Sequence, residues 1–112
     1  MELGLKGKVA IVTGGARGIG GNIVEGFARE GASVVIGDIL LEAAQDLARK
    51  LYESGTKAMP VKTDVTRKSD ADNLIATTMK EFGKIDILVN AAGITQDKCC
   101  LLYTSPSPRD RS

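Results

Sequence analysis

The chain has 112 residues, enough for one small domain and too few for two. Its 15 basic and 14 acidic residues leave a net charge of +1, which argues against nucleic acid or an anionic membrane as a partner. It has no apolar run near the ~20 residues that span a bilayer, and residues 1–8 lack the order of a signal peptide, so we expect a cytoplasmic protein.

The first third of the chain predicts a strand, a helix and a second strand. Residues 8–12 (KVAIV) are a short run rich in β-branched residues that ends at a glycine cluster, which indicates a buried strand. A helix is predicted over 18–30, and Gly31 is expected to end it. A second buried strand is predicted over 33–37, directly before Asp38. The apolar face of the helix consists of Ile19, Ile23, Val24, Phe27 and Ala28.

The middle of the chain predicts a second helix and a weaker strand. The helix covers residues 41–54 and is closed by Gly55. Its apolar stripe consists of Ala44, Leu47, Ala48 and Leu51. The strand covers 57–62 and contains Pro60, which predicts an edge position because proline cannot donate to a neighbouring strand.

A third helix and a fourth strand complete the pattern. Ser69, with Asp72 three residues on, is close to a capping box, and Gly83 is expected to end the helix. Its predicted buried face consists of Leu74, Ile75, Thr78, Met79 and Phe82. The strand over 85–89 contains three consecutive apolar residues, which predicts burial on both sides. The order β-α-β-α-β-α-β predicts an α/β fold with a doubly wound parallel sheet and the first strand near its middle.

The turn between the first strand and the first helix, TGGARGIG at 13–20, is the most informative stretch. Glycine permits a sharp turn, and a Cβ at Gly14 or Gly18 would obstruct a diphosphate close to the backbone. The helix N-terminus adds unpaired N–H groups and partial positive charge, and Gly20 is expected to let the helix pack closely on the sheet. Alone, a glycine-rich turn is weak evidence.

Two further features strengthen a nucleotide-binding interpretation. Asp38 ends the second strand eighteen residues after Gly20, where an acid accepts hydrogen bonds from the hydroxyls of an adenine ribose. Alternatively, Asp38 only caps the following helix. The fourth strand ends in small residues at 91–93, which leave room for a flat ligand at the topological switch point.

Four motifs together resemble the short-chain dehydrogenase/reductase family: TGGARGIG at 13–20, Asp38, Asp-Val at 64–65 and NAAG at 90–93. The resemblance covers about residues 5–98, and ITQD at 94–97 is similar to the stretch found in bacterial 3-oxoacyl-carrier-protein reductases and related alcohol dehydrogenases. It implies a three-layer Rossmann-type sheet, truncated here after the fourth strand. It also implies an NAD(P)-dependent oxidoreductase that transfers hydride to or from a small alcohol, ketone or acyl substrate. The full-length protein is expected to be a homo-oligomer.

The resemblance assigns roles to individual positions. The glycine loop lines the diphosphate, Asp38 binds the ribose, and Asp64 lies near the adenine amino group. The full set of implied cofactor-binding residues is Gly14, Arg17, Gly18, Ile19, Gly20, Asp38, Ile39, Asp64, Val65, Asn90, Ala91 and Gly93. Asp64 and Asn90 also suit turns and helix caps without any ligand. Because a carboxylate at Asp38 would repel the 2′-phosphate of NADP, we expect NAD, although Arg17 could pair with that phosphate.

The catalytic residues of the family have no counterpart here. Its chemistry needs a tyrosine with a lysine four residues on, and a serine. Tyr52 is followed at that spacing by Thr56 and Tyr103 by Ser107, so neither fits. We expect the chain alone to be inactive and, with an exposed apolar edge at 85–89, poorly soluble or loosely packed.

The C-terminal stretch differs from the rest. Residues 99–112 lack periodicity, and 100–110 match the translation of a common transposase-based sequencing adapter. We therefore divide the chain into a partial NAD(P)-binding domain at 1–98 and a non-native tail at 99–112; a genuine disordered tail is the alternative. Cys99 and Cys100 are adjacent and the chain has no histidine, so no metal site is expected.

Two other functions compete with the oxidoreductase. One is an S-adenosylmethionine-dependent methyltransferase, which also uses a glycine loop and a ribose-binding acid on a Rossmann-like sheet. The glycine spacing at 13–20 and NAAG at 90–93 speak against it. The other is a non-catalytic dinucleotide-binding module.

Overall fold

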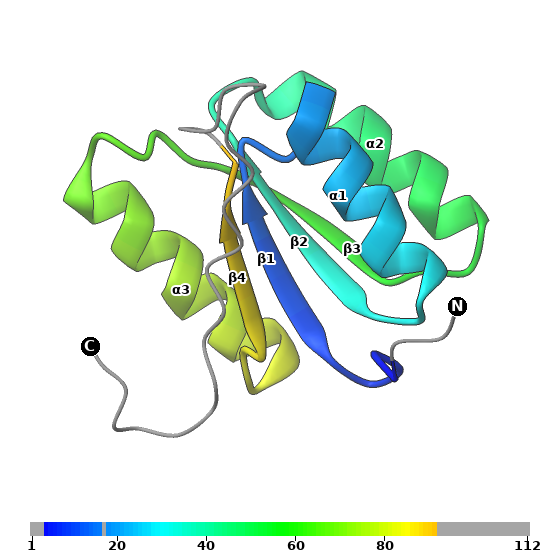
Figure 1. Ribbon diagram of the computed structural model, residues 1–112. Coiled ribbons are helices and arrows are strands. Elements are labelled where there is room, and N and C mark those ends of the chain that lie inside the picture. The colour runs from blue at the N-terminus through cyan, green and yellow to red at the C-terminus, as the bar shows by residue number, and fades with distance from the viewer. Residues whose placement is uncertain (1–3, 17, 92–112) are drawn as a thin grey trace.

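A computed structural model describes residues 4–16 and 18–91 of the chain (Figure 1). The expectations for Arg17, Gly93 and the tail at 99–112 lie outside the described residues. The elements in chain order are β1 (Val9–Thr13), α1 (Gly18–Arg29), β2 (Ser33–Asp38), α2 (Leu41–Glu53), β3 (Ala58–Lys62), α3 (Lys68–Phe82) and β4 (Ile87–Asn90). The predicted alternation of strands and helices is confirmed.

The four strands form one parallel sheet in the order β3-β2-β1-β4. The chain builds outward from β1 to β3 and then crosses back, through α3, to place β4 on the other side of β1. This reversal beside β1 is the topological switch point of a doubly wound sheet. Pro60 lies in β3, at one edge of the sheet, as predicted.

Helices cover both faces of the sheet and give three layers. α1 and α2 lie on one face and α3 lies on the other (Figure 1). Alternate residues of β1 serve the two faces: Val12 joins the core under α1 and α2, whereas Ile11 joins the core under α3. The central strands are therefore buried on both faces, which explains their unbroken apolar sequences.

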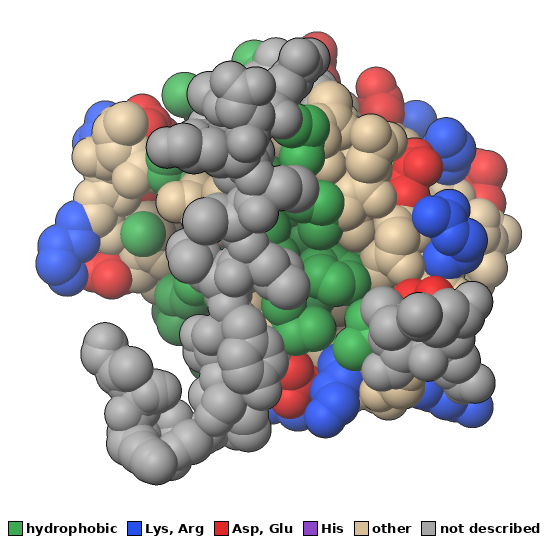
Figure 2. All heavy atoms as spheres, in the orientation of Figure 1, with side chains coloured by type: hydrophobic (Ala, Val, Ile, Leu, Met, Phe, Trp, Pro, Cys, Tyr) green, Lys and Arg blue, Asp and Glu red, His purple; other side chains and the backbone are tan. Residues whose placement is uncertain are grey.

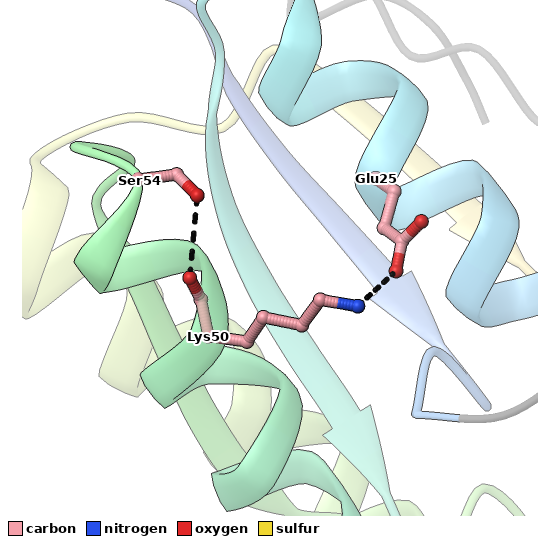
Figure 3. A network of polar contacts seen from close by, with 3 residues as sticks. All are labelled: Glu25, Lys50 and Ser54. Atoms are coloured by element: carbon pink, nitrogen blue, oxygen red, sulfur yellow. Dashed lines mark hydrogen bonds and ion pairs between the residues drawn. The ribbon is translucent and has the colours of Figure 1, made fainter.

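One polar network lies between the two helices that share a face. Lys50 Nζ on α2 lies 3.6 Å from Glu25 Oε2 on α1, and Ser54 Oγ donates to the Lys50 carbonyl oxygen (Figure 3). Both charged side chains are exposed to solvent, so this ion pair contributes no more than about 1 kcal/mol to stability. Apolar packing against the sheet holds α1 and α2 in place.

Two expectations for α3 are wrong. The helix begins at Lys68, after Arg67, without a side-chain cap, and Ser69 is exposed within its first turn. Asp70, instead of Ser69, bonds the backbone that leads into the helix. Leu74 and Thr78 are buried as predicted, with Phe82 half-buried. Ile75 and Met79, however, are 38% and 45% exposed, because α3 touches the sheet along a narrower stripe than its apolar residues cover.

β4 begins two residues later than the sequence predicts, for a reason at Asp86. The Asp86 carboxylate accepts the Val9 N–H at 2.8 Å, while the Asp86 N–H donates to the Val9 carbonyl at 2.9 Å. A side chain thus replaces one ladder bond, and regular pairing starts at Ala10 with Ile87. Ile87 and Val89 are buried, whereas Leu88 on the α3 face is only half-buried.

No helix among the described residues combines the length and the apolar character that crossing a membrane requires.

Candidate functional site

A cleft of about 390 Å³ opens at the carboxyl ends of the strands. It lies beside the switch point, where β1 and β4 diverge in their connections. The lining residues come from the turn after β1, the ends of β2 and β3, and the end of β4. They are Gly14, Gly18, Ile19, Gly20, Asp38, Ile39, Thr63, Asp64, Val65 and Ala91. Nine of these ten belong to the site predicted from the sequence.

The glycine turn forms one wall of the cleft and is anchored to β2. The Gly14 N–H donates to the Gly37 carbonyl at 2.6 Å, and Gly14 has a φ of 67° that a side chain would disfavour. The chain then enters α1 at Gly18, where the first N–H groups of a helix lack partners within the helix. Among the described residues, apart from the chain neighbours of Gly18 and its own helix backbone, no atom lies within 4 Å of the position that a Cβ on Gly18 would take, so these residues leave the backbone there open to a ligand.

Close contacts in and beside the turn explain why two other positions are occupied by glycine. A Cβ on Gly20 would collide with the Gly14 carbonyl group, whose carbon would lie 2.8 Å away. Gly20 therefore packs against the turn and not, as expected, against the sheet. Gly15, which sequence reasoning did not single out, has the expected sheet contact instead. Its Cβ would lie 2.8 Å from the Val12 carbonyl oxygen and 3.0 Å from Val24 Cγ2.

Asp38 lies at the end of β2 and is 2% exposed. Its Oδ2 accepts the Ala16 N–H at 3.1 Å, and its Oδ1 accepts the Leu40 N–H at 2.9 Å. The carboxylate thereby joins the glycine turn to the segment that enters α2. It does not cap that helix, because α2 begins at Leu41 and its cap position has no side-chain hydrogen bond. The capping alternative for Asp38 is therefore wrong.

Asp64 and Val65 form the opposite wall, in the turn between β3 and α3. Asp64 Oδ1 accepts the Thr66 N–H at 3.0 Å and the Thr66 hydroxyl at 2.6 Å. The hydroxyl bond, followed by the backbone bond, lowers the pKa of Asp64 below its ordinary value of 3.8. The carboxylate consequently stays ionised at neutral pH and acts only as an acceptor.

The end of β4 closes the cleft on its third side. The Thr13 hydroxyl donates to Asn90 Oδ1 at 2.9 Å, and the Ala91 N–H donates to the Thr13 carbonyl at 2.9 Å. Ala91 reaches the cleft, whereas Asn90 is exposed outside the lining and ties β4 to β1. Among the described residues, Asn90 is therefore the one predicted cofactor-binding residue that does not line the cleft.

The charge in this cleft is arranged for a ligand with both donors and negative groups. Asp38 and Asp64 supply acceptors at the ends of neighbouring strands. α1 has no acidic residue in its first turn, so its own side chains leave the positive end of its dipole uncompensated. In the described part of the chain, no group of three or more His, Cys, Asp or Glu side chains could hold a metal ion.

Sequence reasoning missed Thr63 and gave no catalytic residue. Thr63 is buried and directly follows β3, and its place at a carboxyl strand end, just before Asp64, is a signal that could have identified it. Tyr52 is 69% exposed on α2 and lines a groove with β3, away from the cleft.

Comparison with known proteins identifies the family. The family model for short chain dehydrogenases matches residues 8–106. The chain belongs to the short-chain dehydrogenase family. This family consists of NAD(P)-dependent oxidoreductases, and the match does not support a methyltransferase.

Individual relatives agree with the family match. The chain is 45% identical over 93 residues to an uncharacterized oxidoreductase of Mycobacterium bovis, covering 83% of this chain and 37% of the relative. A hydroxysteroid dehydrogenase from Escherichia coli superposes with a TM-score of 0.75 at 40% identity, covering 77% of this chain and 36% of that one.

A 3-ketoacyl-(acyl-carrier-protein) reductase from Brucella melitensis, solved in complex with NADH, has a TM-score of 0.70 at 36% identity. That superposition covers 75% of this chain and 33% of the reductase. The chain thus spans only about a third of the length of the relatives that it matches.

Proposed function

We propose that this chain is the nicotinamide-dinucleotide-binding part of an oxidoreductase that transfers hydride between the cofactor and an alcohol or carbonyl substrate. One observation carries the proposal. A glycine turn that tolerates no side chain at Gly20 lies beside a buried carboxylate, Asp38, and both line a cleft at the switch point of the sheet. Family membership and a relative solved with NADH support the same ligand.

Each wall of the cleft suits one part of the dinucleotide. The glycine turn and the first N–H groups of α1 suit the diphosphate, because they offer donors and no obstructing side chain. Asp38 suits the adenosine ribose, and the Asp64 carboxylate suits the amino group of adenine. The proposed cofactor-binding residues are Gly14, Gly18, Ile19, Gly20, Asp38, Ile39, Asp64, Val65 and Ala91, with Asn90 holding β4. Arg17 and Gly93, which lie outside the described residues, complete the proposal.

We favour NAD over NADP. The 2′-phosphate of NADP would approach the Asp38 carboxylate, and the repulsion between two anions would weaken binding. Leu40 and Ala16 hold this carboxylate from both sides, so it cannot easily rotate away from a phosphate.

The bound nicotinamide ring would supply or accept the hydride. The residues of this chain bind and orient the cofactor, and Tyr52 cannot act as the acid or base because it lies away from the cleft. We therefore expect binding without turnover from the 112-residue chain. A whole protein in this family would act on a small alcohol, ketone or acyl group, as the names of the relatives suggest. We also propose a homo-oligomer in the cytoplasm, with residues 1–98 as the binding domain and 99–112 as a non-native tail.

Calorimetric titration of the 112-residue chain with NADH tests the proposal. We expect saturable one-to-one binding and no oxidation of NADH when ketones are added. S-Adenosylmethionine serves as the control ligand and should not bind. The proposal fails if neither NADH nor NADPH binds to folded chain.

A further inference from the structure

The first turn of α3 contains an acid that is directed back toward the cleft wall. Asp70 Oδ2 accepts the Asp64 N–H at 2.9 Å, across the start of the helix. The Arg67 N–H donates to the Asp64 carbonyl at 2.9 Å. Both backbone groups of Asp64 are therefore fixed, one by the backbone of Arg67 just before α3 and the other by the side chain of Asp70 in the first turn of α3.

The Asp64 carboxylate is fixed separately, through one of its two oxygens. Oδ1 accepts both the backbone N–H and the hydroxyl of Thr66. Because Oδ1 carries these two bonds, a donor on a ligand would be accepted by Oδ2. The direction in which Oδ2 points depends on the backbone at Asp64, and that backbone is held by Asp70.

We propose that Asp70 is a positioning residue that, through Asp64, makes the cleft select adenine over hypoxanthine in the dinucleotide. The inference rests on the proposed function. Adenine carries an amino group that can donate to a fixed carboxylate. Hypoxanthine carries a carbonyl oxygen at the same place, which the carboxylate repels. If the Asp64 backbone could shift, the carboxylate would shift with it and much of this discrimination would be lost, because selectivity arises from acceptors that cannot move away from the wrong group.

If Asp70 acted only through its negative charge near the start of α3, replacing another acid there would have the same effect on selectivity. Asp72 provides this comparison. It lies two residues from Asp70, near the start of the same helix. Its carboxylate is 68% exposed and contacts Lys68 Nζ at 3.2 Å. Replacing Asp72 removes an equal charge near the same helix end without touching the Asp64 N–H.

The experiment measures the ratio of two dissociation constants, for NAD and for nicotinamide hypoxanthine dinucleotide, on the full 112-residue chain. We expect the unaltered chain to prefer NAD about tenfold, the scale of one hydrogen bond to a charged group. Asp70→Ala should lower the ratio to about twofold or less, a several-fold loss of the discrimination expected from a fixed carboxylate. Asp70→Asn, which keeps an acceptor oxygen in place, should retain most of the preference, and Asp72→Ala should retain all of it. Circular dichroism checks the fold of each variant.

The outcomes separate the two proposals. If the unaltered chain binds neither dinucleotide, the proposed function fails. If it binds both equally, or if Asp70→Ala and Asp72→Ala leave the same ratio, the inference about Asp70 is overturned while cofactor binding stands. Should Asp70→Ala not fold, Asp70→Ser takes its place, since a serine hydroxyl ends one bond short of the Asp64 N–H. The same loss of preference is expected from it, and an unchanged ratio overturns the inference.

Discussion

Asp38 shows how one side chain can serve the fold and the cleft together. Its two oxygens accept N–H groups from the glycine turn and from the entry to α2, while the residue itself lines the cleft. Replacing it therefore changes both the local backbone and the charge that a ligand meets. The two effects can be separated, because one appears in stability and the other in the choice between ligands.

Asp38→Asn should shift the cofactor preference toward NADP. The amide removes the negative charge that faces the 2′-phosphate, so the NADP-to-NAD affinity ratio should rise about tenfold, equivalent to about 1.4 kcal/mol. Only one acceptor oxygen remains for two N–H donors, so the free energy of unfolding should fall by about 1–3 kcal/mol. Parallel titrations with both cofactors measure the first effect. Asp46→Asn, on the exposed side of α2, is the control, and an unchanged ratio in Asp38→Asn would contradict the cofactor assignment.

Two glycines of α1 make a matched pair. Gly20→Ala would force a Cβ into the Gly14 carbonyl and should destabilise the chain by about 1–3 kcal/mol or more. NADH affinity should fall at least about tenfold, because the turn must move. A Cβ at Gly26 meets no described atom within 4 Å outside its own helix backbone, so Gly26→Ala should stabilise the chain by about 0.5–1 kcal/mol, since alanine favours a helix. Urea unfolding compares the two, and equal stability changes would contradict the packing described here.

For individual residues, the sequence predicts which of them line the cleft better than it predicts which atoms they contact. Nine of the ten lining residues were named by the family resemblance that the motifs carry, and they come together because strand ends in a parallel sheet meet at one edge. The close contact with the sheet that was expected of Gly20 is made by Gly15 instead, since the path of the turn depends on how α1 lies on the sheet. Thr63 was missed because its residue type alone carries no distinctive pattern, and only its place at a carboxyl strand end, just before Asp64, marks it.

Among the elements, β4 depends on a side chain for the start of its pairing. Asp86→Ala would leave the buried Val9 N–H without its present acceptor and should lower the free energy of unfolding by about 1–3 kcal/mol. Lys84→Ala removes only the half-exposed partner of Asp86 and should change it by less than about 1 kcal/mol. Chemical denaturation measures both variants. A larger effect from Lys84→Ala would show that the ion pair, and not the Val9 contact, holds this end of the strand.

The type and order of all seven elements could be predicted, because β-branched runs and helical stripes are strong local signals. Their ends were less accurate. α3 starts before Ser69, since Asp70 reaches back to Asp64, and β4 starts after Asp86, since that side chain replaces a ladder bond. Both deviations arise from hydrogen bonds between an aspartate side chain and a backbone N–H group, and the periodicity of apolar residues does not reveal such bonds.

On the scale of the whole molecule, β4 forms one edge of the sheet and pairs, among described residues, with β1 alone. Figure 2 looks toward this edge, where hydrophobic side chains gather between the α3 side and the α1 and α2 side. Exposed apolar strand edges promote pairing between chains.

The chain should therefore self-associate as its concentration rises. Size-exclusion chromatography coupled to light scattering should show an apparent mass that increases over a hundredfold concentration range. Leu88→Lys places a charge on β4 and should reduce this association, because a charged edge disfavours pairing. Leu40→Lys, at an exposed leucine before α2, is the control and should not. A monodisperse monomer at every concentration, with a sharp thermal transition, would contradict the prediction.

The bond between Thr13 and Asn90 spans 77 positions of the chain. During synthesis, the glycine turn that is proposed to bind the diphosphate is therefore translated long before the residues that β4 contributes to the cleft. A ribosome-bound intermediate ending at Phe82 would carry the glycine turn, Asp38 and Asp64 but lack Ala91. Cofactor added to stalled translation complexes of increasing length should be retained only once the fourth strand has left the exit tunnel.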